Sequence, residues 1–364
     1  MRALALYAGP AALRHIQHHG LQPQHVRALP AAAGGPKGLM LLRLDRFLFG
    51  DWLPQSDQPI DLIGASIGAW RWASACMPDP VAALQELERI YVRGDFGQRQ
   101  EAGTRHVPAP AEVSAAFARF LQQMFAGHEQ AIVQNPRYRL HVLASQGRGL
   151  LQRENGRWQT LAGYLAAYAG NAVQRQALGR WLQRLVFSSG GAALPFDDDR
   201  FPTQQIALEA GNLLTVLQAS GSIPFVLQAV HDIPGAPPGA CWDGGITDYH
   251  LHLRYRGGQG GESGIVLYPH FQRAVIPGWL DKAWRWRHGS SAALDHVLLL
   301  GLRPEWVASL PRGKLPDRSD FRFHLADPAA RMRDWNQAIA ASEQLVDEFA
   351  AWLERPDPGQ VLPP

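Results

Sequence analysis

The chain has 364 residues, of which 46% are hydrophobic, and 35 basic against 32 acidic side chains leave a net charge of only +3. This length and apolar content suffice for a large core, so we expect one continuous domain over residues 1–364. The basic residues form no long cluster, so we expect no nucleic-acid partner.

The two cysteines, Cys76 and Cys241, supply neither a disulfide framework nor a cysteine zinc site, which fits a reducing compartment. The apolar stretch at residues 1–8 is too short for a signal peptide, and no run approaches the length that spans a bilayer. We therefore expect a soluble cytoplasmic protein, and the sequence leaves peripheral contact with a membrane surface open.

In the first hundred residues, short apolar runs that predict strands alternate with amphipathic runs that predict helices. Two successive strand–loop–helix units predict an α/β fold in which helices cover a mostly parallel sheet. In chain order we expect a helix over 10–20 that ends at Gly20, a strand over 26–33, a turn over 34–38, a helix over 39–49, a strand over 60–63, a helix from 69 to about 77, and a helix over 82–93.

The rest of the chain predicts further helices and strands joined by loops. The acidic run at 197–199 lacks the alternating spacing of a calcium site, so we interpret 188–203 as a solvated loop. The other predicted elements are a helical stretch over 96–132, a strand over 138–144, a helical stretch over 160–187, a mostly helical stretch over 206–227 that breaks near Gly221 and Pro224, turns or a hairpin over 230–239, strands over 263–268 and 296–300, and an amphipathic terminal helix over 334–354.

The pentapeptide Gly64-Ala65-Ser66-Ile67-Gly68 lies between a predicted strand and a predicted helix. A G-x-S-x-G sequence in this context is typical of a nucleophile elbow, a tight turn that projects the serine hydroxyl out of the sheet near the positive end of the helix. We therefore expect Ser66 to be a nucleophile. Trp70 and Trp72 follow it and are expected to pack the helix, with Trp70 also a candidate lining of an acyl pocket.

The turn at 34–38 is a candidate oxyanion hole formed by Gly34, Gly35, Lys37 and Gly38. Its glycines allow backbone N–H groups to face a developing oxyanion, and Pro36 has no N–H to offer. A nucleotide-binding loop is disfavoured, because the sequence fits neither the Walker pattern nor G-x-G-x-x-G. An ordinary helix-entry turn remains the alternative.

The candidate base for Ser66 is Asp243, in Asp243-Gly244-Gly245. A carboxylate in a dry site gains proton affinity, and the two glycines permit a close approach. Later histidines leave a Ser–Asp–His triad as an alternative, although none has a distinctive context. These histidines are His250 and His252, which alternate on an apparent strand and are expected at a surface or edge, and His270, His288, His296 and His324.

Together, the loop at 34–38, the pentapeptide at 64–68 and the Asp-Gly-Gly at 243–245 resemble the patatin-like phospholipase family, in which such motifs follow in this order. The segment Ala-Ser-Gly-Ser-Ile-Pro-Phe at 219–225 is similar to the family's A-S-x-x-I/L-P segment. The resemblance covers about residues 24–255 and implies a three-layer patatin-like fold with a mostly parallel central sheet. The loop departs from the family in carrying Ala33 before only two glycines, and in Pro36 and Lys37.

The resemblance implies a Ser66–Asp243 dyad without a catalytic histidine, in a lipid acyl hydrolase or phospholipase A-type esterase that needs no metal and no cofactor. The implied partner is a lipid or another acyl-ester substrate. A rival from another class is a catalytically silent lipid-binding or interaction protein that keeps the fold.

Residues 278–288 interleave three tryptophans with Arg285 and Arg287. This pattern fits contact with a lipid surface, where aromatic rings lie at headgroup level. The alternative, in which the tryptophans pack on the core and the arginines face water, is favoured because the 12 tryptophans are spread through the chain.

Overall fold

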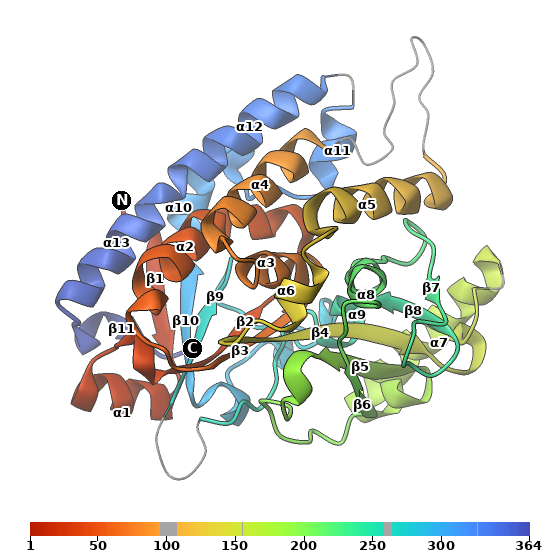
Figure 1. The fold of residues 1–364 in the computed structure, drawn as a ribbon, viewed down its shortest axis with the longest axis horizontal. Helices are drawn as coiled ribbons and strands as arrows, with labels where there is room; N and C mark the ends of the chain where they lie inside the picture. Colours follow the sequence, from red (N-terminus) through yellow and green to blue (C-terminus); the bar gives the residue numbers. More distant parts are fainter. Residues whose placement is uncertain (95–107, 155, 258–263, 326) are drawn as a thin grey trace.

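The computed structural model describes residues 1–94, 108–154, 156–257, 264–325 and 327–364. An eleven-stranded sheet runs through the molecule with helices against it (Figure 1). Its central strands β10, β9, β2, β3 and β4 are parallel to one another, which confirms the predicted α/β class with a mostly parallel sheet. The strand bounds are β1 Leu4–Ala8, β2 Val26–Ala31, β3 Ile60–Ala65, β4 Tyr138–Gly147, β5 Leu182–Ser188, β6 Thr203–Ala207, β7 Val230–His231, β8 Ala240–Asp243, β9 Ile265–Pro269, β10 Val297–Leu302 and β11 Val361–Leu362.

Helices stack outward from one side of the sheet (Figure 1). Helix α3 packs directly on β2, β3 and β4, α4 packs on α3, and α12 packs on α4. The helix bounds are α1 Pro10–His19, α2 Leu42–Phe47, α3 Ile67–Ala75, α4 Pro80–Arg93, α5 Pro110–Phe125, α6 Glu129–Val133, α7 Arg157–Val173, α8 Leu213–Ser220, α9 Gly245–Asp248, α10 Pro304–Ser309, α11 Ser319–Phe323, α12 Pro328–Ala341 and α13 Glu343–Glu354.

The elements around the three motifs are confirmed. Helix α1 ends at Gly20, which has a positive φ of 68°, and the order β2, turn, α2, β3, α3, α4 follows the prediction. The predicted helix over 39–49 is less regular than expected, since α2 lies between a 3-10 helix over Gly35–Leu41 and a π-helical turn over Leu48–Trp52. The predicted hairpin near 230–239 is formed by β7 and β8.

Two helical predictions are partly wrong. Residues 160–187 begin in α7 but end in β5, which is antiparallel to β4 and buried along its whole length. Residues 206–227 begin in the edge strand β6 and become helical only in α8. Strand β5 is buried on both faces and includes the polar Gln183 and Arg184, so its sequence lacks the alternation that separates strand from helix and periodicity could not identify it.

Three other differences concern the two ends and the middle of the chain. No strand is predicted at residues 1–8, yet β1 pairs with β10 and β11 and brings the N-terminus into the sheet. The predicted helix over 334–354 is two helices, α12 and α13, with Ser342 between them. Of the predicted helical stretch over 96–132, residues 96–107 lie outside the described residues, as does residue 263 of the predicted strand over 263–268.

Candidate active site

Ser66 occupies a strained turn between β3 and α3. Its φ of 56° and ψ of −127° lie outside the regions that a non-glycine residue prefers, a conformation that costs about 1–3 kcal/mol and concentrates at functional sites. A Cβ added at Gly64 would lie 2.6 Å from the backbone of Ala69, and one added at Gly68 would lie 2.0 Å from the carbonyl oxygen of Ala31. Both glycines are therefore needed for the strand and helix to close around the serine.

The Ser66 hydroxyl donates a hydrogen bond of 2.9 Å to Oδ2 of Asp243. The other carboxylate oxygen, Oδ1, accepts from the backbone amide of Gly245 at 2.7 Å. Burial raises the pKa of Asp243, opposed by the nearby Arg318 and by the bonds from Gly245 and Ser66. The carboxylate thus has a fixed orientation toward the hydroxyl and a raised proton affinity, which a general base requires.

Ser220 joins the elbow to the strand that carries Asp243. Its hydroxyl accepts from the Ser66 amide at 2.9 Å and donates to the Leu143 carbonyl of β4 at 2.6 Å, and its carbonyl accepts from the amide of Gly244 at 3.1 Å. Ser220 is buried. The segment 219–225 that the sequence singled out therefore holds the two proposed catalytic residues in register, a role that spacing alone did not predict.

The turn at 34–38 forms the start of the 3-10 helix over Gly35–Leu41. Gly35, with a positive φ of 56°, lines a pocket together with Ser66 and Ile67. As the first residue of the 3-10 helix, it has a backbone N–H without a carbonyl acceptor in that helix. Gly34 and Lys37 line a neighbouring pocket with Asp243. Gly38 lines neither pocket, and a Cβ added to it would lie 2.9 Å from the Ile67 side chain, so it allows the loop to pack on α3.

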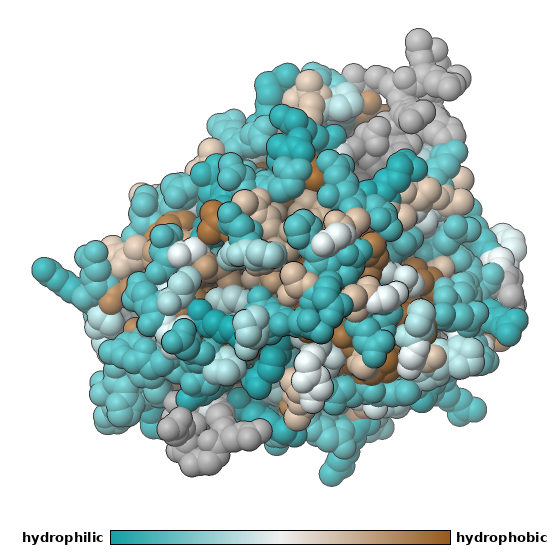
Figure 2. Space-filling model, viewed as in Figure 1, coloured by the Kyte–Doolittle hydropathy of each residue, from teal (hydrophilic) through white to brown (hydrophobic). Residues whose placement is uncertain are grey.

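An apolar pocket of about 440 Å³ opens on the Ser66 side of the pair. Trp70, predicted as a candidate wall, does line it, while Trp72 is buried and donates to the Leu29 carbonyl at 2.8 Å. Figure 2 shows hydrophobic residues gathered on this face of the molecule around α8. The other apolar walls include Val113 and Phe117 of α5 and Ile223, Phe225 and Leu227 after α8.

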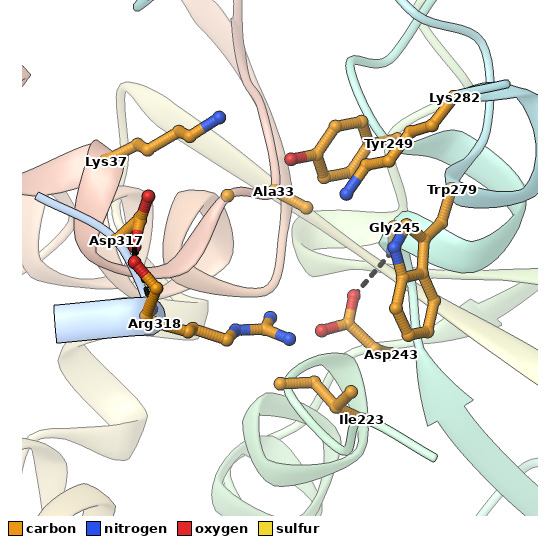
Figure 3. Close-up of a pocket in the computed structure, with 12 residues that line it drawn as sticks. Ala33, Lys37, Ile223, Asp243, Gly245, Tyr249, Trp279, Lys282, Asp317 and Arg318 are labelled. Carbon is orange, nitrogen blue, oxygen red and sulfur yellow. Dashed lines mark hydrogen bonds between the residues drawn. The ribbon is translucent and has the colours of Figure 1, made fainter. Parts of the chain in front are cut away.

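A second pocket, of about 310 Å³, opens on the Asp243 side (Figure 3). Three cations line it, and we call it the cationic pocket: Lys37, Lys282 and Arg318. Figure 3 shows the Arg318 guanidinium pointing toward the Asp243 carboxylate. Arg318 and Ile223 line both pockets, so the Ser66–Asp243 pair lies where the two meet. Neither Lys282 nor Arg318 is predicted from the sequence as a residue of the site.

Among the described residues, no histidine forms a hydrogen bond with Ser66 or Asp243. Contrary to the surface position expected for it, His250 is fully buried, and its Nδ1 lies 3.1 Å from the Ala274 carbonyl. Residues 249–254 form no strand. His252 bonds to Ser291, His270 to Gln272, His288 to Asp281 and His324 to Asp334.

The segment at 278–288 is only partly packed on the core. Trp279 and Trp284 are half-buried, whereas Trp286 is 70% exposed. Arg287 does not simply face water, because it binds the buried Asp281 at 2.7 Å. The acidic run at 197–199 is likewise less solvated than expected, since Asp199 binds the buried Arg184 at 2.9 Å.

Within the described ranges, no three His, Cys, Asp or Glu side chains gather in a way that could hold a metal ion. In the same part of the chain, no helix is both long enough and apolar enough to cross a bilayer.

No protein-family model and no curated protein matches the chain. Among solved structures, VipD from Legionella pneumophila aligns at 12% identity over 89% of this chain and 67% of VipD, with a TM-score of 0.35. Human GIVD cytosolic phospholipase A2 aligns at 13% identity over 94% of this chain, with a TM-score of 0.33, and the chain spans 62% of the human protein.

Proposed function

We propose that the chain is a lipid acyl hydrolase of the phospholipase A type in which Ser66 is the nucleophile and Asp243 the general base. The observation that carries this proposal is the 2.9 Å hydrogen bond between the two side chains, formed at a strained elbow where an apolar and a cationic pocket meet. Because Asp243 occupies the position next to the serine that a histidine would take in a triad, the dyad is favoured over the Ser–Asp–His alternative.

In the first half-reaction, Oγ of Ser66 attacks the ester carbonyl carbon while Asp243 takes the hydroxyl proton. The carbon–oxygen bond to the alcohol then breaks, and the alcohol leaves with the proton from Asp243. In the second half-reaction, water attacks the acyl-enzyme and gives its proton to Asp243. The fatty acid leaves, and the proton returns to Ser66.

The oxyanion would be stabilised by backbone amides that line the Ser66 pocket. The amides of Gly35 and Ile67, at the starts of the 3-10 helix and of α3, lack helical acceptors and are available to a developing negative charge, whereas those of Ala69 and Trp70 already donate to the Ser66 carbonyl. Lys37 and Arg318 add positive charge on the opposite side of the pair. Gly38 would contribute by packing and not as a donor, because its place is against Ile67.

The proposal includes peripheral contact with a lipid surface through α7. After Arg157 this helix has no charged residue, and Trp158 and Val173 on its outer side are more than 80% exposed. Its Tyr164 packs against Phe225, with 5.9 Å between ring centroids, and Phe225 lines the apolar pocket. An apolar surface that leads to the pocket would let an acyl chain enter from a lipid layer.

The surface contact is tested by sedimentation with phospholipid vesicles. The double variant Trp158→Ser/Val173→Ser should sediment with vesicles less than the parent protein does. Leu362→Ser, which removes a partly exposed apolar side chain in β11, is the matched control and should sediment like the parent. Equal sedimentation of all three proteins would contradict a contact through α7.

The catalytic proposal is tested by labelling with a fluorophosphonate probe and locating the adduct by peptide mass spectrometry. We expect an adduct on Ser66 that is lost in Asp243→Asn and retained in alanine variants of the later histidines. Dependence of the adduct on one histidine would favour the triad. A folded protein that binds lipid vesicles but forms no adduct and turns over no ester would be the silent binding protein, and the proposal would fall.

A further inference from the structure

The cationic pocket brings together three positive charges from three separate segments. Lys37 belongs to the glycine-rich turn, Lys282 follows the short 3-10 helix at 279–281, and Arg318 precedes α11. Figure 3 shows all three around one hollow, with Asp243 on its wall. None of the three side chains forms a hydrogen bond or an ion pair with any of the residues that the structure describes.

The two carboxylates in the pocket already have other partners. Asp243 is engaged by Ser66 and Gly245. Asp317 binds Lys314 at 2.8 Å and accepts from both the amide and the hydroxyl of Ser319. The three cations therefore outnumber the carboxylates that face them, and the pocket carries a net positive charge when the lysines are protonated.

The ammonium groups of the two lysines lie over aromatic rings and are not paired with carboxylates. The Lys282 ammonium lies 3.9 Å from the ring centroid of Tyr249, and the Lys37 ammonium lies 5.3 Å from that of Phe271. A cation over a ring keeps most of its capacity to donate hydrogen bonds to another group. Three cations that outnumber the two carboxylates facing them favour an anion in the space between them.

We propose that the cationic pocket binds a phosphate group on the alcohol side of the substrate, while the acyl chain of the same ester occupies the apolar pocket. This inference rests on the proposed function, because the ester carbonyl must then lie at Ser66, between the two pockets. Arg318 lines both pockets, so it can reach a phosphate close to the scissile ester. A planar guanidinium pairs with two phosphate oxygens at once, and the two ammonium groups complete the contacts.

The pocket's size and walls restrict the group that fits. A volume of about 310 Å³ admits a phosphate with a short linker, and Ile223 and Trp279 on the wall would contact the linker's carbon atoms. The substrate class is therefore a monoacyl ester of a small phosphorylated alcohol, with one chain for one apolar pocket.

The test is isothermal titration calorimetry on the full chain with three ligands below any micelle-forming concentration: n-octyl phosphate, 1-octanol and inorganic phosphate. We expect octyl phosphate to bind at least about tenfold more tightly than either of the others, because it alone fills both pockets. In Lys282→Gln/Arg318→Gln, the affinity for octyl phosphate should fall about tenfold or more while that for octanol stays within about twofold.

Two further double variants complete the experiment. Arg14→Gln/Arg254→Gln removes two exposed arginines outside the pocket and should leave all three affinities unchanged. Lys282→Arg/Arg318→Lys keeps both charges and should retain most of the affinity for octyl phosphate. It also shows whether losses in the glutamine variant come from lost charge or from misfolding.

Equal affinities for octyl phosphate and octanol, or an unchanged octyl phosphate affinity in the glutamine variant, would overturn the inference. Inorganic phosphate that binds as tightly as octyl phosphate would also overturn it, because the pocket would then hold a free anion. These titrations involve no turnover. A failed proposal of hydrolysis is detected separately, by the absence of a fluorophosphonate adduct on Ser66.

Discussion

The apolar and cationic pockets share Ile223, Arg318 and Ser319 and meet at one hydrogen bond, yet most of their other walls come from different parts of the chain. Most walls of the apolar pocket come from α3, α5 and the segment after α8, which lie near or between the motifs, and residues 318–322 close one side of it. The cationic pocket draws two of its three cations from the last third of the chain. The reacting pair can therefore be recognised from local motifs, whereas the site for the polar end of a substrate is formed only by tertiary structure.

The largest expected effect comes from Asp243→Asn, which removes the base at the point where the pockets meet. Turnover of phosphorylated and neutral monoacyl esters should fall together by about 10²–10⁴-fold, as expected for loss of a general base. Burial holds the pKa of Asp243 above its usual value. Ionising this carboxyl therefore lowers the free energy of unfolding as the pH rises from the unfolded-state pKa to the folded-state pKa, and the loss is constant at higher pH. The neutral amide lacks this penalty, so the melting temperature should stay equal or rise.

Steady-state kinetics and a thermal melt check this first prediction. Asp243→Glu is the matched control for charge, and it should lower turnover because the longer side chain misplaces the carboxylate. If the turnover of Asp243→Asn stays within tenfold of that of the parent, Asp243 is not the general base.

The next effect concerns the apolar pocket alone. Val113 on α5 is buried and lines this pocket but not the cationic one. Val113→Trp should lower kcat/KM for long-chain esters about tenfold while short-chain esters are affected less, because the larger side chain fills the space for the chain end. Ala115→Trp, on the exposed side of the same helix, is the control. A uniform loss over all chain lengths would place the acyl chain elsewhere.

The sequence predicted those parts of the site that are local in the chain. The elbow needs two glycines at fixed spacing around Ser66, and the Asp-Gly-Gly turn needs them beside Asp243, so each leaves a readable pattern. Lys282 and Arg318 leave none, because a charged residue in a surface segment has the same sequence signature whether it faces water or a pocket. Only the positions of α11 and of the 279–281 turn against the elbow identify them.

The parts of the fold that the sequence predicts are likewise those that are local in the chain. The β2–turn–α2 and β3–α3 units contain their own punctuation in glycines and apolar runs. The strands β1 and β5 depend on distant partners, β10 and β4, for their hydrogen bonds and burial. Their composition fits a helix or a strand, and tertiary pairing decides.

A smaller effect is expected at Ser220, which bonds to the backbone of the elbow and of β4 but lines neither pocket. Ser220→Ala removes the acceptor of the Ser66 amide and the donor to the Leu143 carbonyl. Leaving buried groups unpaired should lower the free energy of unfolding by about 1–3 kcal/mol. Turnover should fall about tenfold on both ester classes with KM unchanged, because positioning is lost and binding is not. A change confined to one class would show that Ser220 belongs to one pocket.

The smallest expected effect is a pH dependence that only the cationic pocket can produce. Desolvation, followed by the nearby Arg318 and Lys37, lowers the pKa of Lys282 to about 8, and Asp243 opposes this shift. Lys282 is therefore charged at pH 7 and loses its charge as the pH rises through about 8, so preference for phosphorylated over neutral esters should fall several-fold between pH 7 and 9. Phosphate monoesters are already dianions over that range, since their second pKa is near 6.

Lys282→Arg separates this titration from that of the other groups facing the pocket, which are Lys37, Tyr249, Asp243, Asp317 and Arg318. A guanidinium stays charged throughout the range, so the fall of the preference with pH should be much smaller in this variant. The measurement is the ratio of kcat/KM for the two ester classes at each pH. An equal decline in the parent and in Lys282→Arg would assign the titration to another group and leave the cationic pocket without a role for Lys282.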